Sequence, residues 1–339
     1  MEPVTHALTS LALARAAQGR LPRYGTTMFL VSGVAADLDY ASYFGGAGAF
    51  LKLHRALLHS LPGSAALICA IAAAFYYFDR KRPSKGSLGP LRFLPAVAVC
   101  SIGAAWHLVL DCASGDSVQL LWPFKVDSAA WNLTTQLDPW VLVLLVAGLL
   151  LPNLFHLVSE EIGERKKGPR GRRGALVTLF LLVAYLGARG ILHSRAEGLL
   201  LSREYHGRAP FFAGAFPSSA SVFEWRGVVV TDNTIEEVEV SLAPGAEFNP
   251  DRSLTHFKPE ESPALGAGEV TPIARTYLAY ARFPLASVIR IEDGYRFELH
   301  DLQFSSSDAS PGNIFVRVDF DGALQVRNSG FHFASSPNQ

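Results

Sequence analysis

The 339-residue sequence has few cysteines and no net charge. Cys69, Cys100 and Cys112 show neither CxxC nor zinc-ribbon spacing, which argues against a disulfide framework and a thiolate metal site. The 30 basic residues balance 30 acidic ones and gather in short segments, so the chain lacks the broad basic face of nucleic-acid-binding proteins. We therefore expect no nucleic-acid partner.

The first residues also lack the basic segment that begins a secretory signal peptide. The stretch MEPVTHALTSLALARAAQG carries Glu2 and His6 where such a peptide is basic or apolar. We therefore expect this stretch to remain part of the folded protein.

Long apolar runs are abundant in the first 200 residues. Hydrophobic residues make up 49% of the chain, and the mean hydropathy of +0.21 is high for a soluble protein. A bilayer core about 30 Å thick requires roughly 20 apolar helical residues. Six segments approach or meet that length: 3–18, 26–44, 61–78, 91–111, 139–158 and 174–193. We predict an α-helical polytopic membrane domain of about six helices over residues 1–200, the first short enough to be re-entrant or interfacial.

The basic residues between these runs predict an orientation. Short basic segments lie at 15–23, 79–86 and 164–173, after the first, third and fifth predicted helices. Short loops rich in Lys and Arg stay on the cytoplasmic side. This places the loop around 54–60, the loop 112–138 and everything after residue 194 on the outer face.

Residues 201–339 have the pattern of an extracytoplasmic antiparallel β domain. Turn signals such as TDNT, EDG and FDG separate several short runs that resemble strands. These runs are 222–230, 235–242, 276–283, 294–304, 313–320 and 323–328. The residues of this domain do not indicate its role.

The membrane domain contains ionisable residues, which are costly at membrane depth and by default mark a site. They are His6, Asp37, Asp39, His54, Arg55, His59, His107 and Asp111. A lone histidine or aspartate of this kind is more often a hydrogen-bonded structural group. The predicted topology, however, brings all of them to the outer end of the helices, which favours one shared metal site.

Spacing divides the roles among these residues. His107 and Asp111 are four residues apart, so an imidazole nitrogen and a carboxylate on one helical face can reach one cation. Arg55 and His59 have the same spacing, whereas His54 points about 140° away from His59 on a regular helix.

The two aspartates of AADLDY pose a different problem. Asp37 and Asp39 are about 200° apart on a helix and cannot reach one point unless the helix ends or unwinds there. One of them is then a ligand, and the other holds a histidine in one tautomer.

We predict five metal ligands and three further catalytic candidates. The predicted ligands are His6, Asp37, His59, His107 and Asp111. Asp39 is expected to orient a histidine or act as general base, Arg55 to grip a phosphate, and His54 is the third catalytic candidate. His and Asp ligands without Cys suit one or two divalent ions, zinc above all, with manganese or iron also compatible.

These blocks resemble the YdjM-type family of inner-membrane, metal-dependent hydrolases, described also as LexA-binding. The resemblance covers about residues 1–125 and rests on His6, the pair Asp37 and Asp39, HRALLHS, and WHLVLDCASGDSVQLLWPF. It implies a multi-pass protein of the bacterial inner membrane. One departure is Tyr40, where the family pattern commonly continues with a histidine.

A looser similarity connects the same residues to the all-helical zinc phospholipase C and nuclease P1 class. That similarity implies that Asp37, His59, His107 and Asp111 hold one metal. It also implies that Asp111 bridges to a second metal bound by His6.

Together these features predict a membrane-bound hydrolase that cleaves a phosphoester, such as a phospholipid or a lipid-linked phosphate, at headgroup depth. Membrane lipid and a lipid or small-molecule phosphoester are the expected partners, and the oligomeric state is left open. Two alternatives remain: a metal-ion or proton transporter, whose pathway would use the same groups, and a non-catalytic membrane scaffold with a structural metal.

Overall fold

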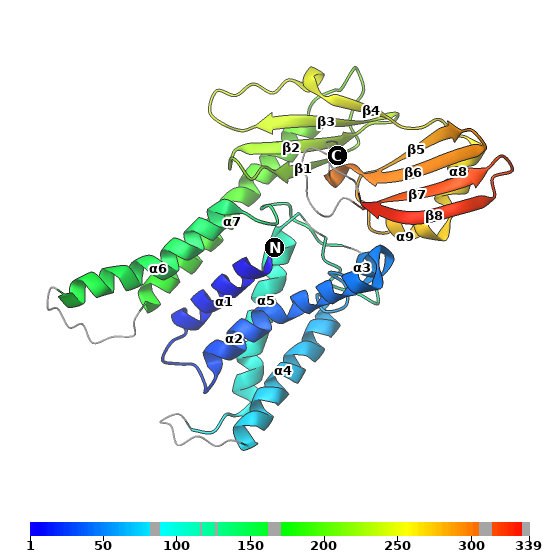
Figure 1. Cartoon of the computed structure of the whole chain (residues 1–339). Coiled ribbons are helices and arrows are strands. Elements are labelled where there is room, and N and C mark those ends of the chain that lie inside the picture. Colours follow the sequence, from blue (N-terminus) through cyan, green and yellow to red (C-terminus); the bar gives the residue numbers. More distant parts are fainter. Residues whose placement is uncertain (82–88, 116, 126–127, 162–170, 305–313, 334–339) are drawn as a thin grey trace. The chain divides into compact units, whose positions relative to one another are not determined.

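The computed structural model contains two compact units (Figure 1). It describes residues 1–339 except 82–88, 116, 126–127, 162–170, 305–313 and 334–339, and it also leaves undescribed the side chains of 153, 155–161 and 333. The helical unit consists of Met1–Asp39, Arg55–His193 and Pro217–Val222. The β unit consists of Tyr40–His54, Ser194–Phe216 and Phe223–Gln339.

Helices occur at all six predicted apolar ranges. They are α1 (Pro3–Ala16), α2 (Gly25–Val34), α4 (Leu61–Lys81), α5 (Phe93–Ala113), α6 (Pro139–Glu161) and α7 (Arg172–Leu201), whose last residues belong to the β unit. Among the described residues, α4, α5 and α7 are long and apolar enough to cross a membrane, and a shorter apolar stretch covers Pro139–Pro152. Helix α1 has 14 residues and α2 has 10, too few for a core about 30 Å thick. Six crossings are therefore not confirmed.

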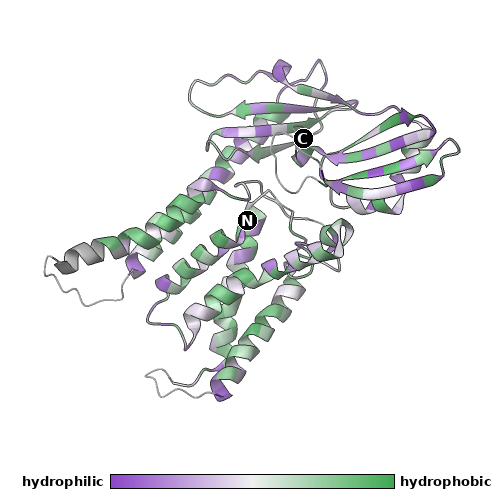
Figure 2. Ribbon diagram, in the orientation of Figure 1, coloured by the Kyte–Doolittle hydropathy of each residue, from purple (hydrophilic) through white to green (hydrophobic). Residues whose placement is uncertain are grey.

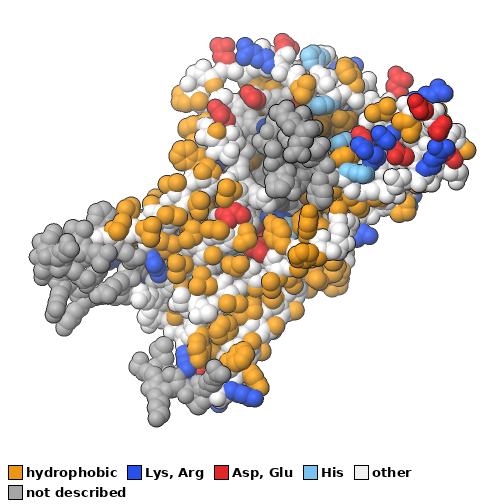
Figure 3. All heavy atoms as spheres, viewed as in Figure 1, with side chains coloured by type: hydrophobic (Ala, Val, Ile, Leu, Met, Phe, Trp, Pro, Cys, Tyr) orange, Lys and Arg blue, Asp and Glu red, His pale blue; other side chains and the backbone are white. Residues whose placement is uncertain are grey.

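The surface of these helices is apolar. Figure 2 shows hydrophobic residues along most of their length, and hydrophobic side chains dominate the helical unit on the face drawn in Figure 3. Large exposed apolar side chains include Phe180 of α7 and Leu94 of α5. Such a surface is stable when lipid covers it.

The predicted helix over 26–44 is wrong in its second half. The α-helix ends at Val34, and the 3₁₀-helix η1 (Ala35–Gly45) follows. Residues 54–60 likewise form turns rather than a regular helix, and Arg55 has a left-handed φ of 56°. Backbone conformations of this kind are strained for non-glycine residues and cluster at functional sites.

Small residues allow α1, α2 and α5 to pack closely. A Cβ atom at Gly33 of α2 would lie 1.9 Å from Ser10 Oγ of α1, and one at Gly103 of α5 would lie 2.3 Å from Ser32 Oγ. Close backbone approach through Gly and Ser is typical of helix pairs in membranes. These contacts bring the start of α1 and the end of α2 beside the last turns of α5.

In the residues that the structure describes, the β unit contains two four-stranded sheets, which confirms the predicted antiparallel β domain. One sheet has the order β1 (Phe212–Pro217), β2 (Glu224–Val230), β3 (Thr234–Ser241) and β4 (Leu254–Phe257). The other has the order β5 (Pro284–Ile291), β6 (Gly294–Asp301), β7 (Ile314–Asp321) and β8 (Val326–Phe333). Three short helices, α3 (Ala47–Leu53), α8 (Pro263–Glu269) and α9 (Pro272–Leu278), belong to the same unit.

The predicted strand 276–283 is wrong, because its first residues complete α9. The side chain of Thr271 accepts a hydrogen bond from the Ala274 amide, and Pro272 occupies the first turn, a favoured start for a helix. Ala274 and Tyr277 then share one buried face. The strand lies later, at β5, and β1 and β4 were also absent from the prediction.

The close packing of α2 makes a stability prediction. We expect Gly33→Ala to lower the free energy of unfolding by about 1–3 kcal/mol, because its methyl group overlaps Ser10. Thermal unfolding in detergent measures the change. Gly187→Ala in α7 is the matched control, since a Cβ there meets no described atom within 4 Å; equal stability of the two variants would contradict the packing argument.

Candidate metal centre

The candidate site surrounds Asp111, a fully buried carboxylate in the last turn of α5. Its Oδ2 atom lies 2.9 Å from His59 Nε2 and 3.0 Å from His107 Nε2. Its Oδ1 atom lies 3.2 Å from His6 Nε2. Three imidazoles from separate parts of the helical unit therefore meet one carboxylate.

The outer nitrogens of two of these rings are already engaged. His107 Nδ1 lies 2.8 Å from the Gly33 carbonyl oxygen, and His59 Nδ1 lies 2.8 Å from Asp39 Oδ2. Because both oxygens can only accept, Nδ1 donates in each case. This arrangement fixes the tautomer and leaves Nε2 as the atom that faces Asp111.

The inner atoms have the spacing of ligands to one cation. The Nε2 atoms of His59 and His107 are 3.1 Å apart, and each lies within 3.0 Å of the buried Asp111 Oδ2. Two nitrogens bound to zinc at 2.0–2.1 Å with tetrahedral angles would be about 3.3 Å apart. Imidazole nitrogen and carboxylate oxygen are donors that zinc accepts, so the residues present fit a divalent metal.

Asp37 and His6 both lie next to His107. Asp37 Oδ1 is 3.8 Å from His107 Nε2, and its buried Oδ2 has no hydrogen-bond partner among the described residues. The His6 ring stacks on His107 with centroids 3.8 Å apart, and in the same part of the chain its buried Nδ1 has no partner either. Two sets of three ligand atoms, each within 4.8 Å of one another, result: His6, His107 and Asp111; Asp37, His59 and His107.

Asp39 and Arg55 also contact the residues around Asp111. Asp39 Oδ2 accepts a 2.8 Å hydrogen bond from the Arg55 backbone N–H in addition to the one from His59. The buried Arg55 guanidinium lies 3.7 Å from Asp111 Oδ1 and donates to Ser114 Oγ at 3.4 Å. The Met1 amino group also contacts Asp111 and Ser114. Asp39 thus has the geometry predicted for an orienting group.

Two titrating groups outside the spanning helices reflect this environment. Burial raises the pKa of the Asp37 carboxyl. Burial lowers the pKa of His59, but hydrogen bonds and charges from Asp111 and Asp39 outweigh it and raise that pKa to about 9. The carboxylates therefore favour positive charge at the centre.

The structure gives His54 a different setting from the other predicted residues. Its ring stacks on Phe50, with centroids 4.3 Å apart, and lies 4.4 Å from the Tyr40 ring. All three residues belong to the β unit, and His54 is in neither set of ligand atoms. Its predicted catalytic role therefore gains no support.

Besides the Met1 amino group, two groups that contact the site were not predicted. The Gly33 carbonyl orients His107, and a backbone group has no residue-type signal in the sequence. Ser114 lies three residues after Asp111 and donates to its backbone carbonyl at 2.8 Å, so its spacing from Asp111 was the available signal.

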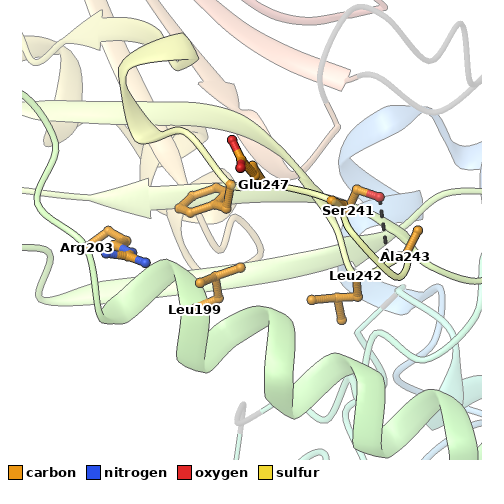
Figure 4. Close-up of a pocket in the computed structure, with 8 residues that line it drawn as sticks. Leu199, Arg203, Ser241, Leu242, Ala243 and Glu247 are labelled. Carbon is orange, nitrogen blue, oxygen red and sulfur yellow. Dashed lines mark hydrogen bonds between the residues drawn. The ribbon is translucent and has the colours of Figure 1, made fainter.

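A separate hollow lies in the β unit. This pocket of about 530 Å³ is bordered by the end of α7 and the residues just after it, and by the end of β3 and the residues that follow, including Leu199, Arg203, Ser241 and Glu247 (Figure 4). It contains none of the residues predicted for the site.

Comparison with known proteins identifies the family. No curated protein and no solved structure matches the chain. The model of a family described as YdjM inner membrane protein matches residues 1–196, which is more than half of the 339 residues and includes every residue of the candidate metal centre. The chain therefore belongs to the YdjM inner membrane protein family.

Proposed function

We propose that this protein is a membrane-bound metal-dependent hydrolase that cleaves a phosphoester. The observation that carries the proposal is the convergence of His59 Nε2, His107 Nε2 and Asp111 Oδ2 within 3.1 Å of one another. Histidines held in this way, with their Nδ1 atoms already donating, are typical of metal ligands.

His59, His107 and Asp111 would hold one divalent metal, with Asp37 as a further ligand. His6 and Asp111 Oδ1 would hold a second ion, if there is one, since they lie 3.2 Å apart. The chemistry that a divalent cation would supply there is polarisation of a scissile phosphoryl oxygen and activation of water as a nucleophile. Zinc is the leading metal, and manganese and iron are compatible with the same donors.

Arg55 supports a phosphoester as the substrate class. Its guanidinium lies 3.7 Å from Asp111 Oδ1 and donates a long hydrogen bond to Ser114 Oγ, at 3.4 Å. A planar guanidinium next to a metal centre can exchange such contacts for a bidentate grip on a phosphate. Asp39 keeps His59 in the tautomer that directs Nε2 to the centre.

The position of the centre supports a substrate at headgroup depth. His59 lies two residues before α4, and Asp111 lies in the last turn of α5, so both are at helix ends rather than mid-membrane. Exposed aromatic residues near these ends include Phe124, Trp131 and Trp140, as in membrane interfaces. With the basic segments on the cytoplasmic side, we propose a multi-pass topology in which the centre and the β unit face outward.

The two alternatives have less support. Transport would need polar groups across the helical unit, yet one described cluster of its helices is apolar, with Met28 and Phe29 of α2 packed among Ala72, Ala96 and Val99. A scaffold with a structural metal would use the buried Arg55 only to compensate the charge of Asp111, whereas a phosphoester hydrolase would also use its planar fork.

The proposed function predicts that the protein binds metal. Purified wild-type protein is expected to retain about one or two equivalents of divalent metal, and the double variant His107→Ala with Asp111→Ala to bind it at least 100-fold more weakly. Loss of a group that only orients a ligand lowers metal affinity about 10–100-fold, and loss of a direct ligand lowers it more. Elemental analysis and titration measure the effect.

A matched double variant controls this experiment. His332→Ala with Asp293→Ala removes the same residue types from the β unit, where neither residue belongs to a set of ligand atoms. Equal metal content in the two double variants would rule out the assigned centre.

A substitution at Arg55 separates hydrolysis from metal binding. Arg55→Lys keeps the charge but removes the planar fork, so we expect the hydrolysis rate in a phosphoester and phospholipid screen to fall about 100-fold. Metal content should not change. The control is Arg20→Lys, at an exposed position, which should leave the hydrolysis rate and the metal content unchanged. A fully active Arg55→Lys variant would show that Arg55 does not bind the phosphate.

A further inference from the structure

Arg189 is a buried arginine in the part of α7 that belongs to the helical unit, with 1% of its surface exposed. Its Nε donates a 2.7 Å hydrogen bond to the Leu133 carbonyl oxygen, and its Nη1 donates to the Val222 carbonyl oxygen. All three residues lie in the helical unit. Because a buried charge is costly unless its partners compensate it, these carbonyls are specific partners, and the contact fixes Leu133 to α7.

The loop between α5 and α6 carries Leu133 and closes the end of α5. The Trp131 N–H donates to the Cys112 carbonyl oxygen at 2.7 Å, and the Leu133 N–H donates to the Ala113 carbonyl oxygen at 2.8 Å. The last carbonyls of a helix have no partner within the helix, and here the loop supplies the donors. The loop therefore fixes the turn of α5 that carries the central carboxylate.

The same loop also holds the other side of the metal centre. The Gln119 N–H donates to the Arg55 carbonyl oxygen at 3.0 Å, and the Leu61 N–H donates to the Leu120 carbonyl oxygen at 2.8 Å. Arg55 and Leu61 flank His59 in the sequence. The loop thus fixes the turns on both sides of this predicted ligand.

Backbone hydrogen bonds join the two halves of the loop. Val118 and Ala129 each donate to the other's carbonyl oxygen, at 3.0 and 2.8 Å, and Ser114 forms a parallel bridge with Thr134. One network of backbone hydrogen bonds therefore leads from the partner of Arg189 to both sides of the centre.

A second contact from α7 secures the end of the loop. The Tyr185 hydroxyl donates to Asp138 Oδ2 at 3.1 Å, and Asp138 Oδ1 accepts from the backbone N–H groups of Trp140 and Val141, as a residue that caps a helix does. Tyr185 lies one turn before Arg189, so one face of α7 contacts the loop at two points. Without Arg189 the end of the loop keeps its contact with α7, but the stretch that closes α5 loses its own.

We propose that Arg189 is a positioning residue for the metal centre: its hydrogen bond to Leu133 fixes the loop between α5 and α6, and the loop holds Asp111 and His59 at the spacing of ligands. The inference rests on the proposed metal-binding function. Arg189 acts through the backbone of the loop rather than as a ligand.

Arg23 provides the matched control. Its Nη1 lies 2.6 Å from Oδ1 of the buried Asp79, and both residues belong to the helical unit. Asp79 is in the last turn of α4, about 27 Å along the helix from Leu61 at its start, near His59. Arg23→Gln therefore removes an arginine from a buried partner at the end of α4 that is remote from the centre.

The test compares Arg189→Gln with Arg23→Gln in the full-length protein in detergent. Co²⁺ titration gives the affinity, the visible absorption spectrum of bound Co²⁺ at saturation reports the ligand geometry, and thermal unfolding reports the loss of stability in each variant.

We expect Arg189→Gln to weaken Co²⁺ binding about 10-fold, as loss of an orienting interaction does, and to change the Co²⁺ spectrum. Arg23→Gln should stay within about twofold of the wild-type affinity and keep the wild-type spectrum, even where it lowers the unfolding temperature. If either variant does not fold, Arg189→Lys is compared with Arg23→Lys by the same criteria, since lysine keeps the charge but loses the planar fork.

Two outcomes overturn the inference in different ways. Equal Co²⁺ affinity and spectra in the Arg189 and Arg23 variants would mean that Arg189 only stabilises the helical unit, and the proposed function would stand. A wild-type protein that binds no Co²⁺ would overturn the proposed function and this inference together.

Discussion

The structure of the helical unit depends on the buried carboxylate of Asp111. A charge removed from water is stable only when partners compensate it, and here those partners come from α1, α5 and the turns before α4. His6, His59 and His107 each direct Nε2 to this carboxylate within 3.2 Å. The glycines that let α1, α2 and α5 approach closely therefore help to bring these partners to Asp111.

The sequence predicts those parts of the centre whose geometry depends on a single helix. His107 and Asp111 are one turn apart on α5, and a regular helix fixes their geometry without reference to anything else. The sequence predicts that Asp37 and Asp39 can both reach the centre only if the helix ends before them. It does: α2 ends at Val34, and η1 places Asp37 near His107 and Asp39 near His59.

What the sequence does not predict is set by distant contacts. The Gly33 carbonyl is a backbone group whose role depends on how α2 packs against α5. The turns around Arg55, with its left-handed backbone, depend on Asp39 accepting two hydrogen bonds. Likewise, the pattern of 276–283 fits a strand, but the cap at Thr271 and burial of Tyr277 favour a helix.

The buried carboxylate also has a thermodynamic consequence. His6 comes from α1, His107 from α5 and His59 from the turns before α4, and all three meet Asp111. A metal bound to this set, as proposed, would bind only when these parts of the helical unit are packed together, so packing and metal binding would be coupled. Coupling of this kind is reciprocal: whatever free energy the packing of the helices adds to metal binding, the metal would return to the packing.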